Sequence, residues 1–227
     1  MGQARVAGQA HVISRYKELG KTVLIKEYDA SWPVYFAKIS SIIAKALHDV
    51  AHRIEHVGST SVPGLAAKPI IDIDVVYTTP YDFLEIGRRL YKIGYLHNGN
   101  QGIPDREAFK RIESRRKHLI LDKIRHHLYV CPLESAELKR HLLFRDYLRE
   151  NEWARKEYVG LKNDIAIRAN QDQKVYASMK ESEARDFVLR IIELAEQPPK
   201  ATSGKHMNTD SLRKKAKTED TRELSEV

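Results

Sequence analysis

Residues 56–76 read HVGSTSVPGLAAKPIIDIDVV and join a glycine–serine turn to a short apolar strand that carries two acids. Side chains alternate between the two faces of a strand, so Asp72 and Asp74 point to the same side. Neighbouring carboxylates repel each other, and a divalent cation such as Mg²⁺ or Mn²⁺ relieves that repulsion through oxygen ligands. The stretch therefore predicts a metal clamp at these two residues. The turn at Gly58 and Ser59 is predicted to cradle an anion beside it.

The composition indicates one globular domain with a tail. The chain has 227 residues, of which 42% are hydrophobic and 31% charged, enough for a sizeable core. No run approaches the ~20 apolar residues that a membrane span needs, and residues 1–20 lack the apolar region of a secretory signal. The single cysteine, Cys131, excludes an internal disulfide and is expected in the core. We therefore expect a cytoplasmic protein that makes no use of membranes.

The charge is positive and unevenly spread. The formal net charge is +8, and basic residues are dense between Arg106 and Arg125. Such a surface near a metal site attracts phosphorylated ligands or RNA, whereas in a solvated hairpin the same residues would only keep the protein soluble. A second basic cluster runs from Arg213 to Lys217. It is either a nuclear or nucleic-acid signal or part of a solvated tail.

Hydrophobic periodicity and turn residues predict the elements of the N-terminal part. The chain is expected to begin with a loose leader over 1–20, a short strand over 21–26, and a helix that is entered at 29–33 and ends near Leu47. A strand over 53–57 and a short helix or loop over 59–67 then lead to a strand over 70–77. A helix over 81–93, ended by Gly94, is followed by strands at 95–97, 108–114 and 119–131. The last two runs are expected to pair antiparallel beside the carboxylate strand. The apolar stripe of the first helix is expected in the core.

The pattern becomes helical after Pro132. Three helices are expected, over 134–149, 151–170 and 173–196, and the polar residues 197–227 are expected to be a disordered basic tail. The domain then covers 21–196. On these helices Tyr158 and Lys162 are spaced to share one face, which we interpret as a structural contact. Arg145 and its neighbour Asp146 are interpreted as an ion pair that fixes a helix on the sheet.

The central stretch carries a family resemblance. A Gly-Ser pair followed about a dozen residues later by Asp-apolar-Asp resembles the signature of polymerase-β-type nucleotidyltransferases. The longer string EHVGSTSVPGLAAKPIIDI, residues 55–73, resembles the GrpB family, a branch of that superfamily. The resemblance extends over about residues 22–192, through the motifs HLYV at 127–130, LFRDYLR at 143–149 and the pair Tyr176 and Lys180.

The resemblance implies a fold and a set of site residues. The implied fold is α/β (α+β): a mixed sheet of nucleotidyltransferase type with flanking helices and a C-terminal helical layer. Asp72 and Asp74 would then be catalytic and bind Mg²⁺ or Mn²⁺. The candidate nucleotide- and phosphate-binding residues are Gly58, Ser59, Thr60, Lys68, Arg106, Lys110, Tyr176 and Lys180.

The chain departs from the superfamily at the third carboxylate. The superfamily fold takes a third acid from a strand beside the first two, and the matching strand here reads HHLYV, residues 126–130. His127 is the candidate for that position as a metal ligand, although imidazole suits Zn²⁺ or Fe²⁺ better than Mg²⁺. Glu55 and Asp122 are the remaining acids that could substitute. The departure indicates either an altered metal preference or lost catalysis.

The sequence therefore leaves several functions open. The leading hypothesis is a metal-dependent nucleotidyltransferase that uses a nucleoside triphosphate and an unidentified acceptor. One alternative is a non-catalytic nucleotide- or anion-binding module that assists folding, since some proteins of the family are fused to a dephospho-CoA kinase domain. Another is an RNA-binding accessory protein that uses the basic segment 106–125. The sequence does not decide whether the protein is an enzyme, nor does it give the oligomeric state.

Overall fold

The structure, a computed structural model, describes residues 23–112 and 116–197. The expected leader over 1–20 and all but the first residue of the expected tail lie outside these ranges. The elements in chain order are α2 (Ser31–Ala46), β1 (Arg53–Val57), a 3-10 turn (Ser59–Ser61), β2 (Ile71–Tyr77), α3 (Pro80–Lys92), β3 (Tyr95–His97), β4 (Glu107–Arg111), β5 (His126–Pro132), α4 (Ala136–Glu150), α5 (Glu152–Arg168), α6 (Gln173–Glu183) and α7 (Arg185–Glu196). None of the helices in the described ranges is long and apolar enough to cross a bilayer.

Five strands form one mixed sheet in the order β1-β2-β5-β4-β3. The central pair, β2 and β5, is parallel, and the pairs β1–β2, β4–β5 and β3–β4 are antiparallel. A mixed sheet with helices on its faces and further helices at its C-terminal end is the fold that we expected. Parallel neighbours need a long crossover, and here the chain passes through α3, β3 and β4 between β2 and β5.

The main core lies on one face of the sheet, under α2 and α3. Ile71, Ile73 and Val75 of β2 point to this face and are almost completely buried. They form one cluster with the apolar stripe of α2, including Ile39 and Ile43. The alternation of β2 that buries these residues sends Asp72 and Asp74 to the opposite face, so core packing fixes where the carboxylates point.

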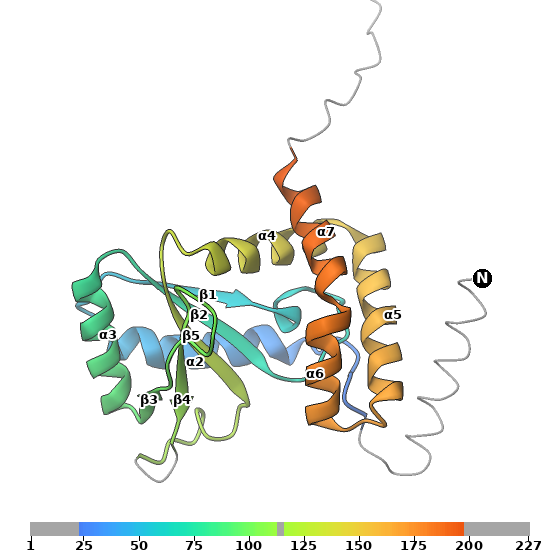
Figure 1. The fold of residues 1–227 in the computed structure, drawn as a ribbon. Coiled ribbons are helices and arrows are strands. Elements are labelled where there is room, and N and C mark those ends of the chain that lie inside the picture. Colours follow the sequence, from blue (N-terminus) through green and yellow to red (C-terminus); the bar gives the residue numbers. More distant parts are fainter. Residues whose placement is uncertain (1–22, 113–115, 198–227) are drawn as a thin grey trace, which may run out of the picture. The chain divides into compact units, whose positions relative to one another are not determined.

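On the opposite face, Leu138 of α4 packs against Val76 of β2 and Cys131 of β5. Figure 1 shows α5, α6 and α7 standing together to the right of the sheet, with α3 to its left. These helices form a second core with the loop between β1 and β2, in which Val62 and Leu65 contact Tyr158, Phe187 and other residues. The C-terminal layer therefore packs on the loop that follows the glycine–serine turn.

One of the expected strands is shorter than predicted. The run 119–131 is a strand only from His126, because residues 119–124 form a turn whose Asp122 accepts hydrogen bonds from Arg111 Nε, 2.7 Å, and from the backbone N–H of His118, 2.5 Å. As expected, β4 and β5 pair antiparallel, and β5 lies beside the carboxylate strand, to which it runs parallel. Of the expected strand 108–114, the part Ala108–Arg111 belongs to β4, and residues 113–115 lie outside the described ranges.

Two further expectations need correction. In the described part of the expected strand 21–26, only Lys26 makes strand-like contacts, an isolated bridge with two hydrogen bonds to Ala67. The expected helix 173–196 is divided into α6 and α7 at Ala184. Ala184 is 2% exposed and belongs to the core around the β1–β2 loop. The helix is therefore broken by packing at a position where the sequence has no glycine or proline.

The turn after β1 depends on the absence of a side chain at Gly58. This residue has φ +69°, and a Cβ added to it would lie 2.3 Å from Asp72 Oδ2. The left-handed backbone and the close approach of the carboxylate both require glycine. Just before the turn, the His56 ring stacks on Phe36 of α2 at 4.5 Å, and His56 Nε2 lies 3.2 Å from Thr60 Oγ1.

We expect Gly58→Ala to destabilise the protein more than Gly64→Ala does. Gly64 also has a positive φ, +75°, but no heavy atom within 4 Å of its added Cβ, so it is a control for a positive-φ glycine without the close contact. Gly64→Ala should lower the free energy of unfolding by about 1–2 kcal/mol from the positive φ alone. Gly58→Ala should lower it by at least about 1 kcal/mol more, because Asp72 must move. Urea unfolding measures both. Equal losses would contradict the account of the turn.

We expect His56 to make stability depend on pH in acid. Burial, partly countered by Asp72, lowers the pKa of His56 to about 4, against about 6.5 in the unfolded chain. Between these values the unfolded chain binds a proton that the folded protein does not, so stability falls as pH falls from about 6.5 to about 4, by up to ~3 kcal/mol.

The test compares the unfolding free energy of the wild type with that of His56→Gln at pH 7 and near pH 4. The wild type should be the more stable protein at pH 7, and this advantage should shrink towards pH 4. His48→Gln, at an exposed position, controls for the titration of a solvated histidine. An advantage that stays constant over this range would show that His56 does not titrate as described.

Candidate functional site

β2 presents two carboxylates to the face of the sheet opposite the main core. The Asp72 side chain is 29% exposed, whereas that of Asp74 has no exposed surface. In the register of the sheet, Glu55 of β1 lies opposite Asp74. On the other side, His127 and Tyr129 of β5 are the partners of Asp72 and Asp74. The site is therefore built on the three strands β1, β2 and β5.

Each carboxylate is held by a histidine. His127 Nδ1 lies 2.9 Å from Asp72 Oδ1, and His141 Nδ1 of α4 lies 2.7 Å from Asp74 Oδ2. The Nε2 atom of His141 lies 3.3 Å from a carboxylate oxygen of Glu137. Burial favours neutral His141, but the hydrogen bonds with Asp74 and Glu137 outweigh it and raise the pKa of His141 to about 9. The imidazolium thus offsets part of the charge of the site at neutral pH.

One oxygen of this arrangement has no hydrogen-bond partner. Asp74 Oδ1 is buried and accepts no hydrogen bond from the described residues, although buried carboxylate oxygens ordinarily have partners. In residues 23–112 and 116–197, no group of three or more His, Cys, Asp or Glu side chains is arranged to hold a metal ion. Mg²⁺ is commonly bound by one or two carboxylates plus phosphates, and Asp74 Oδ1 and the Asp72 carboxylate are the candidate oxygens for such a site.

The other nearby acids are occupied elsewhere. Glu55 accepts a hydrogen bond from Arg145 Nη1 at 2.7 Å and lies 3.0 Å from Arg53 Nε. Arg145 also pairs with its neighbour Asp146, as we expected, but it is the bond to Glu55 and not this pair that fixes α4 on β1. Asp122 belongs to the turn before β5. Neither Glu55 nor Asp122 therefore supplies the missing third carboxylate.

The glycine–serine turn lies against Asp72. Gly58 makes the close approach described above, and its carbonyl accepts a hydrogen bond of 2.6 Å from the Ser61 hydroxyl. Ser59 is half-buried at the start of the 3-10 turn. Thr60 is 1% exposed and donates its hydroxyl hydrogen to the carbonyl of Ile70 at 3.1 Å. The Thr60 hydroxyl is thus committed within the loop, and Gly58 is the residue of the turn that lies against Asp72.

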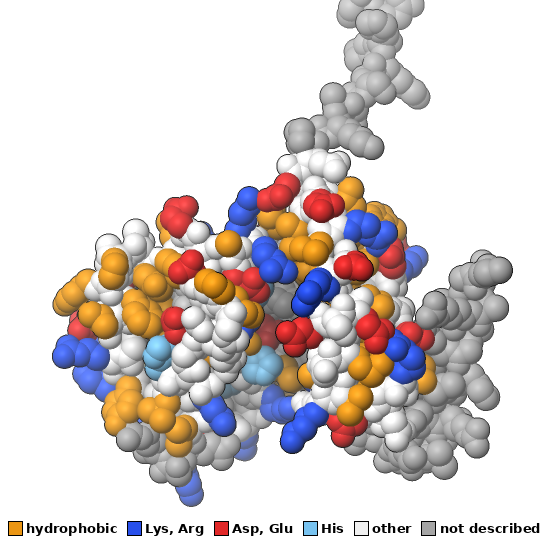
Figure 2. Space-filling model, viewed as in Figure 1, with side chains coloured by type: hydrophobic (Ala, Val, Ile, Leu, Met, Phe, Trp, Pro, Cys, Tyr) orange, Lys and Arg blue, Asp and Glu red, His pale blue; other side chains and the backbone are white. Residues whose placement is uncertain are grey.

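Lysines and tyrosines form a second group, where α5 and α6 meet the loop before β2. Lys68 Nζ lies 5.1 Å from the centroid of the Tyr176 ring, and Lys162 Nζ lies 4.5 Å from that of Tyr158. Lys180 interacts electrostatically with Tyr158. We call these five residues the lysine–tyrosine cluster. On the face shown in Figure 2, histidine, acidic and basic side chains gather where the sheet meets the C-terminal helices.

The pKa values of two lysines of this cluster shift in opposite directions. Interaction with Tyr158, and further with Tyr176 and Asp72, raises the pKa of Lys180 in spite of its burial. Burial and then the charge of Lys180 lower the pKa of Lys68. The negative charge of Asp72 raises the pKa of both lysines as a smaller contribution.

Lys162 has a different place in the cluster. It is 2% exposed, its Nζ donates a hydrogen bond to the backbone carbonyl of Ala66, and burial lowers its pKa well below the ordinary range. Through this hydrogen bond, the buried Lys162 connects α5 to the loop that precedes β2. This geometry agrees with the structural interpretation of the Tyr158–Lys162 pair.

Arg106 lies on the other side of the carboxylates. Its guanidinium carbon is 4.3 Å from the centroid of the Tyr129 ring, and its Nε is buried without a hydrogen-bond partner among the described residues. Burial, followed by the charge of Asp72, raises the pKa of Tyr129 to about 12, so this phenol stays protonated. Arg106 thus offers an unused donor beside a neutral aromatic ring.

Two other basic residues of the segment 106–125 have different surroundings. Lys110 is exposed at the end of β4, on the same face as Ala108, one residue beyond the last pair with β5. Arg111 instead bonds to Asp122 and to the backbone carbonyl of Ile93. Arg106 thus packs on Tyr129, the partner of Asp74 in the sheet, whereas Lys110 forms no ion pair with the carboxylates in the described part of the chain.

Sequence reasoning missed two residues of this site, His141 and Glu137. Both come from α4, and the contact of His141 with Asp74 spans 67 positions in the chain. The available signal was their spacing of four residues, which puts an acid and a histidine on one helix face. Cys131, in contrast, is fully buried as expected, and burial raises the pKa of its thiol far above the ordinary value.

Known proteins resemble this chain over most of its length. UPF0157 protein BH1888 of Halalkalibacterium halodurans is 32% identical over 182 residues, which cover 80% of this chain and 89% of that protein. The crystal structure of the conserved protein GrpB from Enterococcus faecalis matches with a TM-score of 0.62 and 30% identity, covering 76% of this chain and 99% of that one. A dephospho-CoA kinase of Mycolicibacterium paratuberculosis is 27% identical over 211 residues, and the match covers 85% of this chain but only 51% of that enzyme.

The family model described as GrpB protein matches residues 22–192. This range includes the whole sheet, the glycine–serine turn, both aspartates and the lysine–tyrosine cluster. Together with the sequence and structural relatives, the match shows that the chain belongs to the GrpB family.

Proposed function

We propose that the protein binds a nucleoside triphosphate together with Mg²⁺ or Mn²⁺ and transfers its nucleotidyl group to an acceptor. One observation carries the proposal: a carboxylate oxygen without a partner, on Asp74, lies beside Asp72, which interacts with the charged Lys180. Carboxylates that attract a cation and lysines that attract phosphates thus adjoin each other. A metal–triphosphate complex has this distribution of charge.

The two aspartates would hold the cation. Asp74 offers Oδ1, and Asp72 is exposed enough for a ligand to reach it. His127 and His141 already occupy the other oxygens, so each histidine orients its carboxylate. This geometry favours an orienting role for His127 over direct coordination. When bound, the cation neutralises charge on the phosphates and on the leaving group.

The phosphates would lie between the turn and the lysine–tyrosine cluster. Gly58 leaves room for a close approach, and Ser59 supplies a hydroxyl at the start of the turn. Lys68 and Lys180 supply the positive charge, and Tyr176 holds Lys68 in place through its ring. Arg106 approaches from the opposite side and has an unused Nε–H donor; guanidinium groups bind phosphate oxygens in a directed way.

The proposed reaction is a substitution at the α-phosphorus. An acceptor hydroxyl oxygen forms a bond to that phosphorus and gives up its proton to solvent, the bond to the bridging oxygen breaks, and pyrophosphate leaves with the bonding electron pair. Lys68 and Lys180 would stabilise the charge that develops on the pyrophosphate. Small molecules, protein hydroxyl groups and RNA ends all carry suitable acceptor oxygens.

A second candidate function is nucleotide binding without transfer. It is favoured by the positions next to β2, where His127 and Tyr129 pair with Asp72 and Asp74 and no acid does. The positive charge of His141 also neutralises part of the charge of Asp74, as a bound cation would. Such a module would bind nucleotide with little dependence on metal and would release no pyrophosphate.

We predict that Lys180→Met weakens nucleoside triphosphate binding about tenfold or more in the presence of Mg²⁺, because it removes a charge-assisted contact worth about 1.5–3 kcal/mol. Lys174→Met, an exposed lysine of the same helix, is the matched control and should bind as the wild type does. Isothermal titration calorimetry with a panel of nucleotides measures these affinities. Equal affinity of the two variants would contradict the assignment of Lys180.

We predict that Asp72→Asn and Asp74→Asn abolish pyrophosphate release, lowering it at least about a hundredfold. Asn at position 74 can still accept a hydrogen bond from His141, so the loss would report the carboxylate charge and not the fold. Asp186→Asn, exposed on α7, is the control. Nucleotide binding without pyrophosphate release from the wild type, whichever of the three acceptor classes is supplied, would favour the second candidate function.

A further inference from the structure

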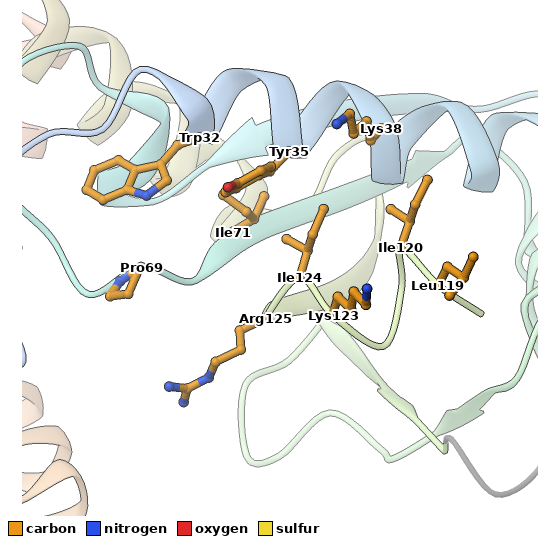
Figure 3. A pocket seen from close by; sticks show the side chains of 10 residues that line it. All are labelled: Trp32, Tyr35, Lys38, Pro69, Ile71, Leu119, Ile120, Lys123, Ile124 and Arg125. Atoms are coloured by element: carbon orange, nitrogen blue, oxygen red, sulfur yellow. The ribbon is translucent and has the colours of Figure 1, made fainter. Parts of the chain in front are cut away.

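A second cavity opens on the other face of the sheet, away from the carboxylates. Its volume is about 450 Å³, within the range of about 300–1,000 Å³ typical of small-molecule sites. Figure 3 shows Trp32, Tyr35 and Lys38 of α2 on one side and the turn 119–125 on the other, with Pro69 and Ile71 between them. Ile71 and Asp72 are neighbours in β2 and point to opposite faces, so the cavity and the carboxylate site are separate.

The walls of this cavity are apolar. Trp32 and Ile71 are 2% and 1% exposed and belong to the main core, and Ile120 and Ile124 pack against that core. At the mouth, Leu119 is 78% exposed. A cavity that runs from an exposed leucine down to the core would bury the apolar body of a ligand.

The charged groups at the cavity are all positive. Lys38, Lys123 and Arg125 line it, and no acidic residue is among the ten lining residues. None of the three forms an ion pair with a carboxylate of the described residues. Cations of like sign around a concave apolar surface repel each other and attract an anion.

We propose that this cavity binds a small organic anion with an apolar body, of aromatic or branched aliphatic character, and one acidic group. The body would lie against Trp32, Tyr35 and Ile71, and the acidic group would lie at Lys38 and Lys123. Arg125 extends from the same turn at the edge of the cavity (Figure 3) and adds positive charge there. The acidic group is a carboxylate, a sulfonate or a phosphate, which share this chemistry.

Anilinonaphthalene sulfonate is a suitable probe, because it combines an aromatic body with one sulfonate and fluoresces when bound. The chain has two tryptophans, and Trp153 is exposed on α5. The variant Trp153→Phe therefore leaves Trp32, in the wall of the cavity, as the only tryptophan. A probe bound in the cavity should quench Trp32 and receive its excitation energy.

The charge test uses the double variant Lys38→Glu/Lys123→Glu in the Trp153→Phe background. Reversing two charges should weaken probe binding about tenfold or more. The matched control is Lys45→Glu, an exposed lysine of the same helix that does not line the cavity, and it should change binding less than twofold. N-phenyl-1-naphthylamine has the same aromatic body without the sulfonate, so its affinity should not fall in the double variant.

Competition by 1-naphthoate and by 1-naphthyl phosphate then distinguishes a carboxylate from a phosphate ligand. Displacement of the probe by either compound, with loss of the Trp32 signal, supports the proposal and names the preferred acidic group. The proposal is overturned if the probe does not affect Trp32, or if the double variant binds it as well as Lys45→Glu does. These outcomes do not depend on nucleotide binding at Asp72 and Asp74, which lies on the other face.

Discussion

The repulsion between Asp72 and Asp74 is the constraint around which the site is organised. Packing of Ile71, Ile73 and Val75 under α2 sends both carboxylates to the same face of β2. Because the core fixes their direction, the surroundings must compensate their charge. They do so with two histidines, with lysines beyond Asp72, and with a buried oxygen of Asp74 that has no protein partner.

This compensation also explains the order of the helices around the sheet. Arg145 bonds Glu55 and so anchors α4 on β1, which places His141 at Asp74. Lys162 ties α5 to the carbonyl of Ala66, next to Lys68. The C-terminal helices thus pack on the loop between turn and strand, and by doing so they supply the positive half of the site. In the proposed function, the carboxylates and the lysines, held on different layers, would bind the two ends of a metal–triphosphate complex.

Local patterns predicted the elements whose neighbours are close in sequence. The alternation in β2 identified the paired aspartates, and the stripe from Trp32 to Leu47 identified α2 and its buried face. What failed depended on distant contacts. The turn at 119–124, where a strand was expected, follows from the hydrogen bonds that Asp122 accepts from Arg111 and His118. The contact of His141 with Asp74 spans the sheet and a helix, so it cannot be read from either segment alone.

The family assignment followed from one continuous stretch, whereas the chemistry depends on residues from five elements. The nucleotidyl-transfer proposal requires a cation that the aspartates share with the nucleotide. The most direct measurement is electron paramagnetic resonance of Mn²⁺ with the protein, with and without a nucleoside triphosphate. The account predicts weak Mn²⁺ binding to the protein alone and a distinct protein–Mn²⁺–nucleotide spectrum that Asp74→Asn removes. A Mn²⁺–nucleotide spectrum that the protein leaves unchanged would contradict it.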